Sequence, residues 1–113
     1  MHELGVVIEI VKTVEAFVAS NGVTRIDTLV LQIGELSSAV PKYVEACYPA
    51  AVEGTLLEGT KLKIEILPAN AICARCRKVF GLVGSGGECP RCGSEEYEAL
   101  GGRELKIKEI VAR

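Results

Sequence analysis

The sequence of 113 residues has no tryptophan, and its aromatic residues are three tyrosines and two phenylalanines. A core without large rings has to be built from aliphatic side chains, and 49% of the residues are hydrophobic. Apolar runs such as residues 29–31 are far shorter than the roughly 20 residues that cross a bilayer. We therefore expect a single domain from the length of the chain, and no membrane contact from its short apolar runs.

An excess of basic charge is also missing. The 13 lysines and arginines are outnumbered by 15 acidic residues, which leaves a net charge of −2 and a pI near 5.5. A surface that mainly binds phosphate needs the opposite balance, so nucleic acid is not the expected partner. The first residues contain no basic segment followed by an apolar one, so we expect no secretory leader.

Four of the five cysteines form two Cys-x-x-Cys pairs, Cys73 with Cys76 and Cys89 with Cys92, separated by twelve residues. This is the pattern of one tetrahedral Zn²⁺ held by four thiolates. The short gap turns both sulfurs of a pair toward one ion, and the intervening loop folds back as a ribbon. Four cysteines leave no coordination position for water, which indicates a structural metal.

The residues around the pairs suit such a centre. Glycines loosen the tip of the loop, and one after the second pair permits a left-handed turn. Cations help to keep thiolates deprotonated when the site carries a formal charge of −2. The glycines are Gly81, Gly84, Gly86, Gly87 and Gly93, and the cations are Arg75, Arg77, Lys78 and Arg91.

Two disulfides or a thioredoxin-like redox pair are the other interpretations of these cysteines. The fifth cysteine, Cys47, lies on an apolar helical stripe and is interpreted as a small buried hydrophobe. Zinc-spaced cysteines with one left over suit a reducing compartment better than a secreted disulfide framework, so we expect the cytoplasm.

Periodicity predicts two helices and three strands outside the cysteine loop. Residues 4–19 repeat apolar side chains at helical spacing and stop at Asn21-Gly22. A second helix is expected to be capped by Ser37 or Ser38, with Pro41 in its first turn and an early end or kink at Pro49. Strand-like alternation covers residues 25–36, 61–67 and 105–111.

In the first of these strands, Leu29, Leu31 and Ile33 are predicted on one face and Thr28, Val30 and Gln32 on the other, with a bulge or a close backbone approach at Gly34. The expected fold class is α+β, with two helices packed on a small sheet of about three strands and an inserted zinc-ribbon subdomain. The expected domains are residues 1–70 plus 101–113 for the α+β body and residues 71–100 for the ribbon.

The single histidine, His2, directly follows the N-terminal residue. Its imidazole Nδ1, its amide nitrogen and the α-amine of Met1 can reach one ion in fused chelate rings, with Glu3 next in line. Such nitrogen-rich donor sets suit Ni²⁺ or Cu²⁺. By itself this signal is weak, because a histidine at this position is usually only solvated.

The motifs together resemble the HypA/HybF family of nickel metallochaperones for hydrogenase maturation. The resemblance covers almost the whole chain. It is carried by residues 1–4 (Met-His-Glu-Leu), 33–37 (Ile-Gly-Glu-Leu-Ser), Gly54-Thr55 with Glu58-Gly59, both cysteine pairs with Gly93, and residues 104–108 (Glu-Leu-Lys-Ile-Lys).

The resemblance implies a non-enzymatic carrier in which His2 is the essential nickel ligand, helped by the Met1 amine and the Glu3 backbone or carboxylate. It also implies structural zinc on Cys73, Cys76, Cys89 and Cys92. The implied partners are a HypB-type GTPase and the [NiFe]-hydrogenase large subunit, and in some organisms urease maturation. Nucleic acid and membranes are not implied.

Three positions depart from the family pattern. Gly5 replaces a common serine, Gly93 replaces a histidine that often follows the last cysteine, and residues 38–41 carry no carboxylate. The alternatives are a zinc-ribbon module that binds nucleic acid or a protein assembly, and a thiol oxidoreductase. Few stacking aromatics and many glutamates oppose the former, and four-fold zinc ligation would remove the free thiolate that the latter needs.

Overall fold

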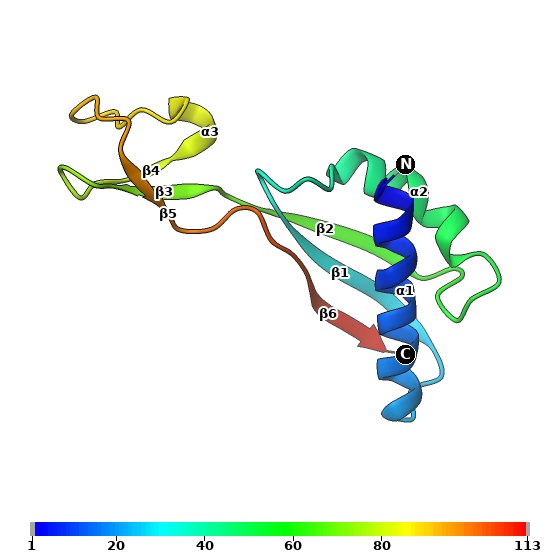
Figure 1. The fold of residues 1–113 in the computed structure, drawn as a ribbon. Coiled ribbons are helices and arrows are strands. Elements are labelled where there is room, and N and C mark those ends of the chain that lie inside the picture. Colours follow the sequence, from blue (N-terminus) through cyan, green and yellow to red (C-terminus); the bar gives the residue numbers. More distant parts are fainter. Residues whose placement is uncertain (1, 113) are drawn as a thin grey trace. The chain divides into compact units, whose positions relative to one another are not determined.

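The computed structural model of the chain describes residues 2–112, and for His2 the backbone alone (Figure 1). The elements in chain order are α1 (His2–Ser20), β1 (Ile26–Gly34), α2 (Pro41–Val52), β2 (Lys61–Leu67), β3 (Asn70–Cys73), β4 (Val79–Gly81), α3 (Leu82–Ser85), β5 (Tyr97–Ala99) and β6 (Leu105–Ala112). Within the described residues the strands form two three-stranded sheets, in the orders β2-β1-β6 and β4-β3-β5. The predicted α+β class is confirmed, and the four cysteines of the predicted ribbon gather beside the second small sheet.

The described chain divides into two compact units. One takes in residues 2–32, 39–65 and 106–112, and the other takes in residues 33–38 and 66–105. The predicted domains, 1–70 plus 101–113 and 71–100, stay a prediction.

In the first unit, α1 buries the face that its 3.6-residue periodicity marks out. Val7, Val11, Val14 and Val18 are at most 2% exposed, and the helix packs against α2. Gly22 follows in the left-handed conformation with φ 68°, and the N–H of Val23 donates to the carbonyl of Val18. The predicted helix and its glycine stop are both confirmed.

The central strand β1 is buried on both of the faces that its alternation predicted. Leu29 and Ile33 are fully buried, but Thr28 and Val30 are also at most 8% exposed. The side chain of Lys108 on β6 donates to the Glu65 carboxylate on β2 at 3.0 Å, so the pair spans the strand between them. The Glu65 carboxylate also accepts a hydrogen bond from the Gln32 amide on β1, so long polar side chains of all three strands meet at this point of the sheet.

The second helix lacks its predicted serine cap, and it continues past the proline at which a kink or an early end was predicted. Its N-cap is Val40 without a side-chain cap, so neither Ser37 nor Ser38 caps it, while Pro41 begins the helix as expected. Pro49 lies inside the helix, which continues to Val52. Proline has no N–H to donate to the carbonyl of Glu45, and both residues are exposed, so water can bond to that carbonyl instead. The buried Val52 holds the last turn of the helix against the core. Cys47 is buried as predicted.

The second unit combines the cysteine ribbon with the turn that follows β1. The N–H of Glu35 donates to the carbonyl of Leu67, and the N–H of Leu36 donates to the carbonyl of Gly102. The side chain of Leu36 packs against the ribbon's small core. That core consists of Ala69, Ala71, Cys73, Phe80, Leu82 and Cys89.

Candidate metal centre

All four cysteines of the two pairs converge at one point of the second unit. Their sulfurs lie within 4.8 Å of one another, with Cys73 Sγ 3.6 Å from Cys92 Sγ and Cys76 Sγ 3.5 Å from Cys89 Sγ. These separations are too long for disulfides, and all four thiols are free. A tetrahedral Zn²⁺ with bonds of about 2.3 Å separates its sulfurs by roughly 3.8 Å. The four thiols thus fit such an ion in number, type and spacing.

The first cysteine pair begins at the end of a strand. Cys73 is the last residue of β3, the central strand of its sheet, and faces Tyr97 of β5. The chain turns back directly after it, since the N–H of Cys73 donates to the carbonyl of Lys78 and the N–H of Arg77 donates to the carbonyl of Cys73. Arg77 closes this turn in the left-handed region with φ 65°.

The second pair has the same turn without a strand. The N–H of Cys89 donates to the carbonyl of Ser94, and the N–H of Gly93 donates to the carbonyl of Cys89. Gly93 has φ 77°, which confirms the left-handed turn predicted there. Arg77 occupies the equivalent position of the first turn, four residues after the first cysteine, and sequence reasoning missed its conformation because arginine rarely adopts it.

Backbone donors favour the thiolate of Cys73. The N–H groups of Cys76 and Arg75 each lie 3.4 Å from its sulfur. Hydrogen bonding from Cys76, helped by Arg75, lowers the pKa of Cys73 to about 6. This cysteine is therefore prepared to bind a cation near neutral pH.

In the second pair, the pKa values of the two thiols shift in opposite directions. Burial raises the pKa of Cys89, but the N–H groups of Cys92 and Arg91 outweigh it and lower that pKa. For Cys92 the N–H of Ser94 acts to lower the pKa, but the neighbouring Cys73 thiol and burial raise it to about 11. A bound divalent cation removes this competition, because it stabilises all four thiolates together.

The predicted nickel ligands lie at the edge of what the structure describes. Met1 and the side chain of His2 are outside the described residues. Glu3 lies in the first turn of α1, is 7% exposed and already has an interaction partner. Within the described part of the chain, the four cysteines are the group of potential metal ligands that the structure brings together.

Two further features bear on the alternative functions. Phe80, the candidate stacking aromatic of the ribbon, is 6% exposed and packs edge-on against Tyr97 with ring centroids 6.1 Å apart. The buried ring of Phe80 therefore cannot stack on a base. None of the helices in the described chain is long and apolar enough to cross a membrane.

Sequence reasoning did not find the contact that anchors residues 33–38. The carboxylate of Glu35 accepts a hydrogen bond from the N–H of Ala69 at 3.0 Å. The close approach predicted at Gly34 is confirmed, since a Cβ there would overlap the backbone at Gly102 and Arg103. Before the structure, the family resemblance was the one indication that residues 35–37 matter. No local sequence pattern shows that Glu35 contacts Ala69.

Comparison with known proteins agrees with this arrangement. Residues 1–112 match the family described as "Hydrogenase/urease nickel incorporation, metallochaperone, hypA". Hydrogenase maturation factor HypA of Geobacter metallireducens is 37% identical over 110 residues, which cover 97% of each chain. The HypA factor of Trichodesmium erythraeum is 40% identical over 111 residues, covering 97% of this chain and 94% of its own.

Two solved structures share the fold. The Ni metallochaperone HypA from Helicobacter pylori superposes with a TM-score of 0.68 at 22% identity, covering 97% of this chain and 96% of its own. A second HypA protein gives 0.72 at 23% identity, covering 100% and 97%. From the full-length match and these relatives, the chain belongs to the HypA family of nickel metallochaperones for hydrogenase and urease maturation, which are maturation factors and not enzymes.

Proposed function

We propose that this protein binds Ni²⁺ through Met1, His2 and Glu3 and delivers it to the large subunit of a [NiFe]-hydrogenase. The observation that carries the proposal is the match of residues 1–112 to a nickel-incorporation family in a chain whose single histidine is His2. The imidazole of His2 is the essential ligand, and the Met1 amine and the His2 amide nitrogen complete fused chelate rings.

The start of α1 suits this role. His2 begins the helix, and the first N–H groups of a helix have no intrahelical acceptor. Deprotonation of the His2 amide by nickel therefore breaks no helical hydrogen bond. Because Glu3 is buried, we favour its backbone over its carboxylate as a donor.

Delivery follows from the small number of protein ligands. A chelate that is completed by water or by a partner can pass its ion on by ligand exchange. Cu²⁺ binds such donors more tightly than Ni²⁺, so selectivity depends on the partners and on metal supply. The proposed partners are a HypB-type GTPase, the hydrogenase large subunit and, in organisms that have it, the urease maturation system, all in the cytoplasm.

The four cysteines hold a structural zinc ion in this proposal. The convergent sulfurs and the buried ribbon core support this assignment. When bound, zinc supplies a cross-link between two turns that otherwise share little core. With four thiolates in its shell it has no position for a substrate, so it takes no part in carrying nickel.

The test is a calorimetric titration with nickel of three proteins that are matched for zinc content. They are the unmodified chain, a chain extended by two N-terminal residues, and the variant His2→Ala. We expect one tight nickel site in the unmodified chain and at least 100-fold weaker binding in the other two. Binding should also weaken from pH 7.5 to pH 5, because the imidazole protonates near pH 6.5.

The zinc content separates the two parts of the proposal. One zinc ion in all three proteins, with nickel bound tightly by the unmodified chain only, supports both sites. Equal nickel binding in all three contradicts the N-terminal site and points to the cysteines. Equal binding at pH 5 and pH 7.5 would rule out an imidazole ligand.

A further inference from the structure

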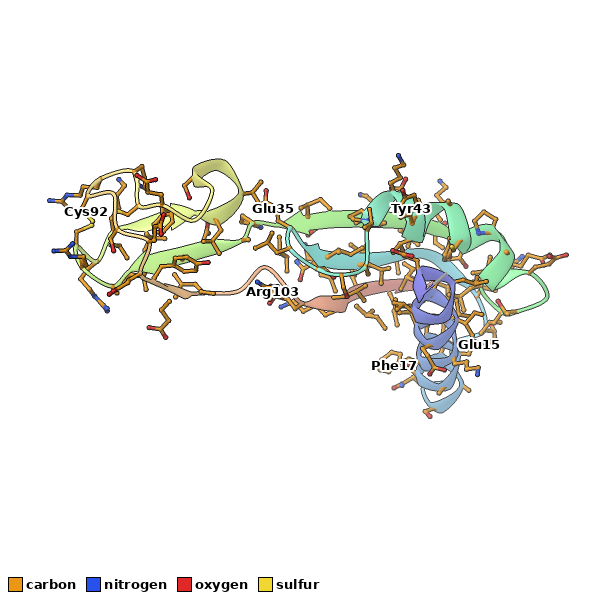
Figure 2. All side chains as sticks on the ribbon, turned by 45° about the horizontal axis from the view of Figure 1, so that its top comes forward. Glu15, Phe17, Glu35, Tyr43, Cys92 and Arg103 are labelled. Atoms are coloured by element: carbon orange, nitrogen blue, oxygen red, sulfur yellow. The ribbon has the colours of Figure 1, made fainter. Side chains whose placement is uncertain are left out.

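The four cysteines of the metal centre are unequally enclosed. Cys73 is fully buried and Cys89 is 1% exposed, whereas Cys76 is partly exposed and Cys92 is exposed. Figure 2 shows Cys92 in the loops beyond the strands of the second unit. Each pair therefore has one enclosed member, and Cys92 is the most accessible of the four.

The two turns also differ in what holds them. The first continues from β3, whose residues pair with β4 on one side and with β5 on the other. The second contains no strand and is closed by its own hydrogen bonds, Cys89 N–H to Ser94 and Gly93 N–H to Cys89. Movement of the second turn thus breaks no sheet hydrogen bonds, while movement of the first does.

Space for an incoming molecule adjoins the second turn. A hollow of about 260 Å³ is lined by Ser85, Glu88, Cys89, Pro90 and Gly93. Gly93 contributes no side chain, and a Cβ there would lie 3.5 Å from the Glu88 carboxylate. A small molecule can therefore approach the second turn from the side of Cys89, while Cys92 is reached directly from solvent because it is exposed.

We propose that Cys92 is the exchangeable ligand of the centre: its thiolate leaves first, and a small external thiol takes its place while the other three cysteines keep the metal. In this exchange the Cys92 sulfur loses its metal bond and gains a proton. The incoming thiol loses a proton and forms the equivalent bond, so neither oxidant nor reductant is needed. The inference rests on the proposed zinc assignment.

The first test is the order in which the cysteines of the full-length zinc-loaded chain react with limiting N-ethylmaleimide. In this reaction the sulfur bonds to an alkene carbon and the adjacent carbon takes a proton from water. Peptide mapping should find Cys92 modified at least tenfold faster than Cys73, Cys76 or Cys89. Labelling of the denatured, metal-free chain gives the intrinsic rates for comparison.

The second test uses the chain loaded with Co²⁺, whose thiolate charge-transfer absorption reports the number of sulfur ligands. One equivalent of maleimide should lower this absorption by about a quarter without releasing cobalt. Release of the metal at that point, or simultaneous reaction of all four cysteines, overturns the proposal. Faster reaction of Cys76 than of Cys92 overturns it as well.

The two proposals fail separately. If the purified chain contains no zinc, the zinc assignment is contradicted. If that chain still binds Co²⁺, the cobalt experiment decides the role of Cys92. One zinc ion per chain with an equal reaction of all four cysteines leaves the zinc assignment standing and overturns the exchangeable ligand. A chain that binds neither metal overturns both.

Discussion

The backbone of Gly34 lies so close to that of Gly102 that there is no room for a side chain between them. A Cβ on Gly34 would overlap the Gly102 carbonyl and stand 2.7 Å from the amide nitrogen of Arg103. The N–H of Gly34 donates to the carbonyl of Glu104 at 2.7 Å, which holds the two segments together. In the second unit, the turn after β1 is therefore joined through its backbone to the segment that follows the ribbon.

Replacing Gly34 with alanine should destabilise the protein by about 3 kcal/mol, because the added methyl group meets backbone that cannot move aside. Urea denaturation of the zinc-loaded chain measures this loss. Gly5→Ala is the matched control, since a Cβ at Gly5 contacts nothing within 4 Å and alanine favours the helix by about 0.5 kcal/mol. Equal effects of the two substitutions would contradict the close approach.

The carboxylate of Glu35 should be needed as an acceptor and not as a charge. Glu35→Ala leaves the N–H of the fully buried Ala69 without its partner, which should cost about 2 kcal/mol. Glu35→Gln keeps an oxygen in place and should cost less than half as much. The free energy of unfolding decides between these outcomes, and an equal loss in both variants would show that the negative charge matters.

Removal of the metal should loosen the second unit selectively. Two of the six residues of its buried core are the proposed zinc ligands Cys73 and Cys89, so loss of the ion would disturb the core itself. Hydrogen exchange after chelation should accelerate by at least 100-fold at the amides of Cys73 and Leu82. The amides of α1 should change by less than tenfold, and a uniform change along the chain would be the contrary result.

Stability should fall at high pH through Tyr48. Its hydroxyl donates to the carbonyl of Thr60, and burial raises its pKa from 10.0 to about 12. A raised pKa means that the stabilisation is complete below pH 10 and is lost as the pH rises through 12. By pH 11 this single group should remove about 1.4 kcal/mol.

The variant Tyr48→Phe isolates that contribution. It should lose about 1 kcal/mol at pH 8 with the hydrogen bond, and it should then decline less steeply than the original chain between pH 8 and pH 11. The exposed Tyr43 provides the control, since Tyr43→Phe should leave the pH profile unchanged. Identical slopes for the original chain and for Tyr48→Phe would refute the assignment to Tyr48.

The features that could be predicted from the sequence depend on short-range patterns. Helical spacing marked the buried valines of α1, alternation marked the strands, and paired cysteines marked the ribbon. The left-handed turn at Gly93 and the close approach at Gly34 followed from the freedom of glycine. Apart from the distance between the two cysteine pairs, the residues that specify each feature lie within a few positions of one another.

The differences between local pattern and structure have a common physical origin. Pro49 was predicted to kink α2 or to end it early, and the exposure of Pro49 and the burial of Val52 allow the helix to continue to Val52. Thr28 and Val30 were predicted on the face opposite Leu29, Leu31 and Ile33, but both faces of this central strand are buried. Local propensity was overridden in both places by contacts with residues distant in the sequence.

The sequence by itself determined the class of fold, the cysteine donors and the family to which the chain belongs, because these depend on residue types at short spacing. Only the tertiary structure decided that Glu35 anchors the turn after β1 to Ala69, that Leu36 completes the ribbon core, and that Cys92 is the exposed donor. Exposure and long-range pairing are properties of the packed chain, since they depend on which distant segments fold against each residue.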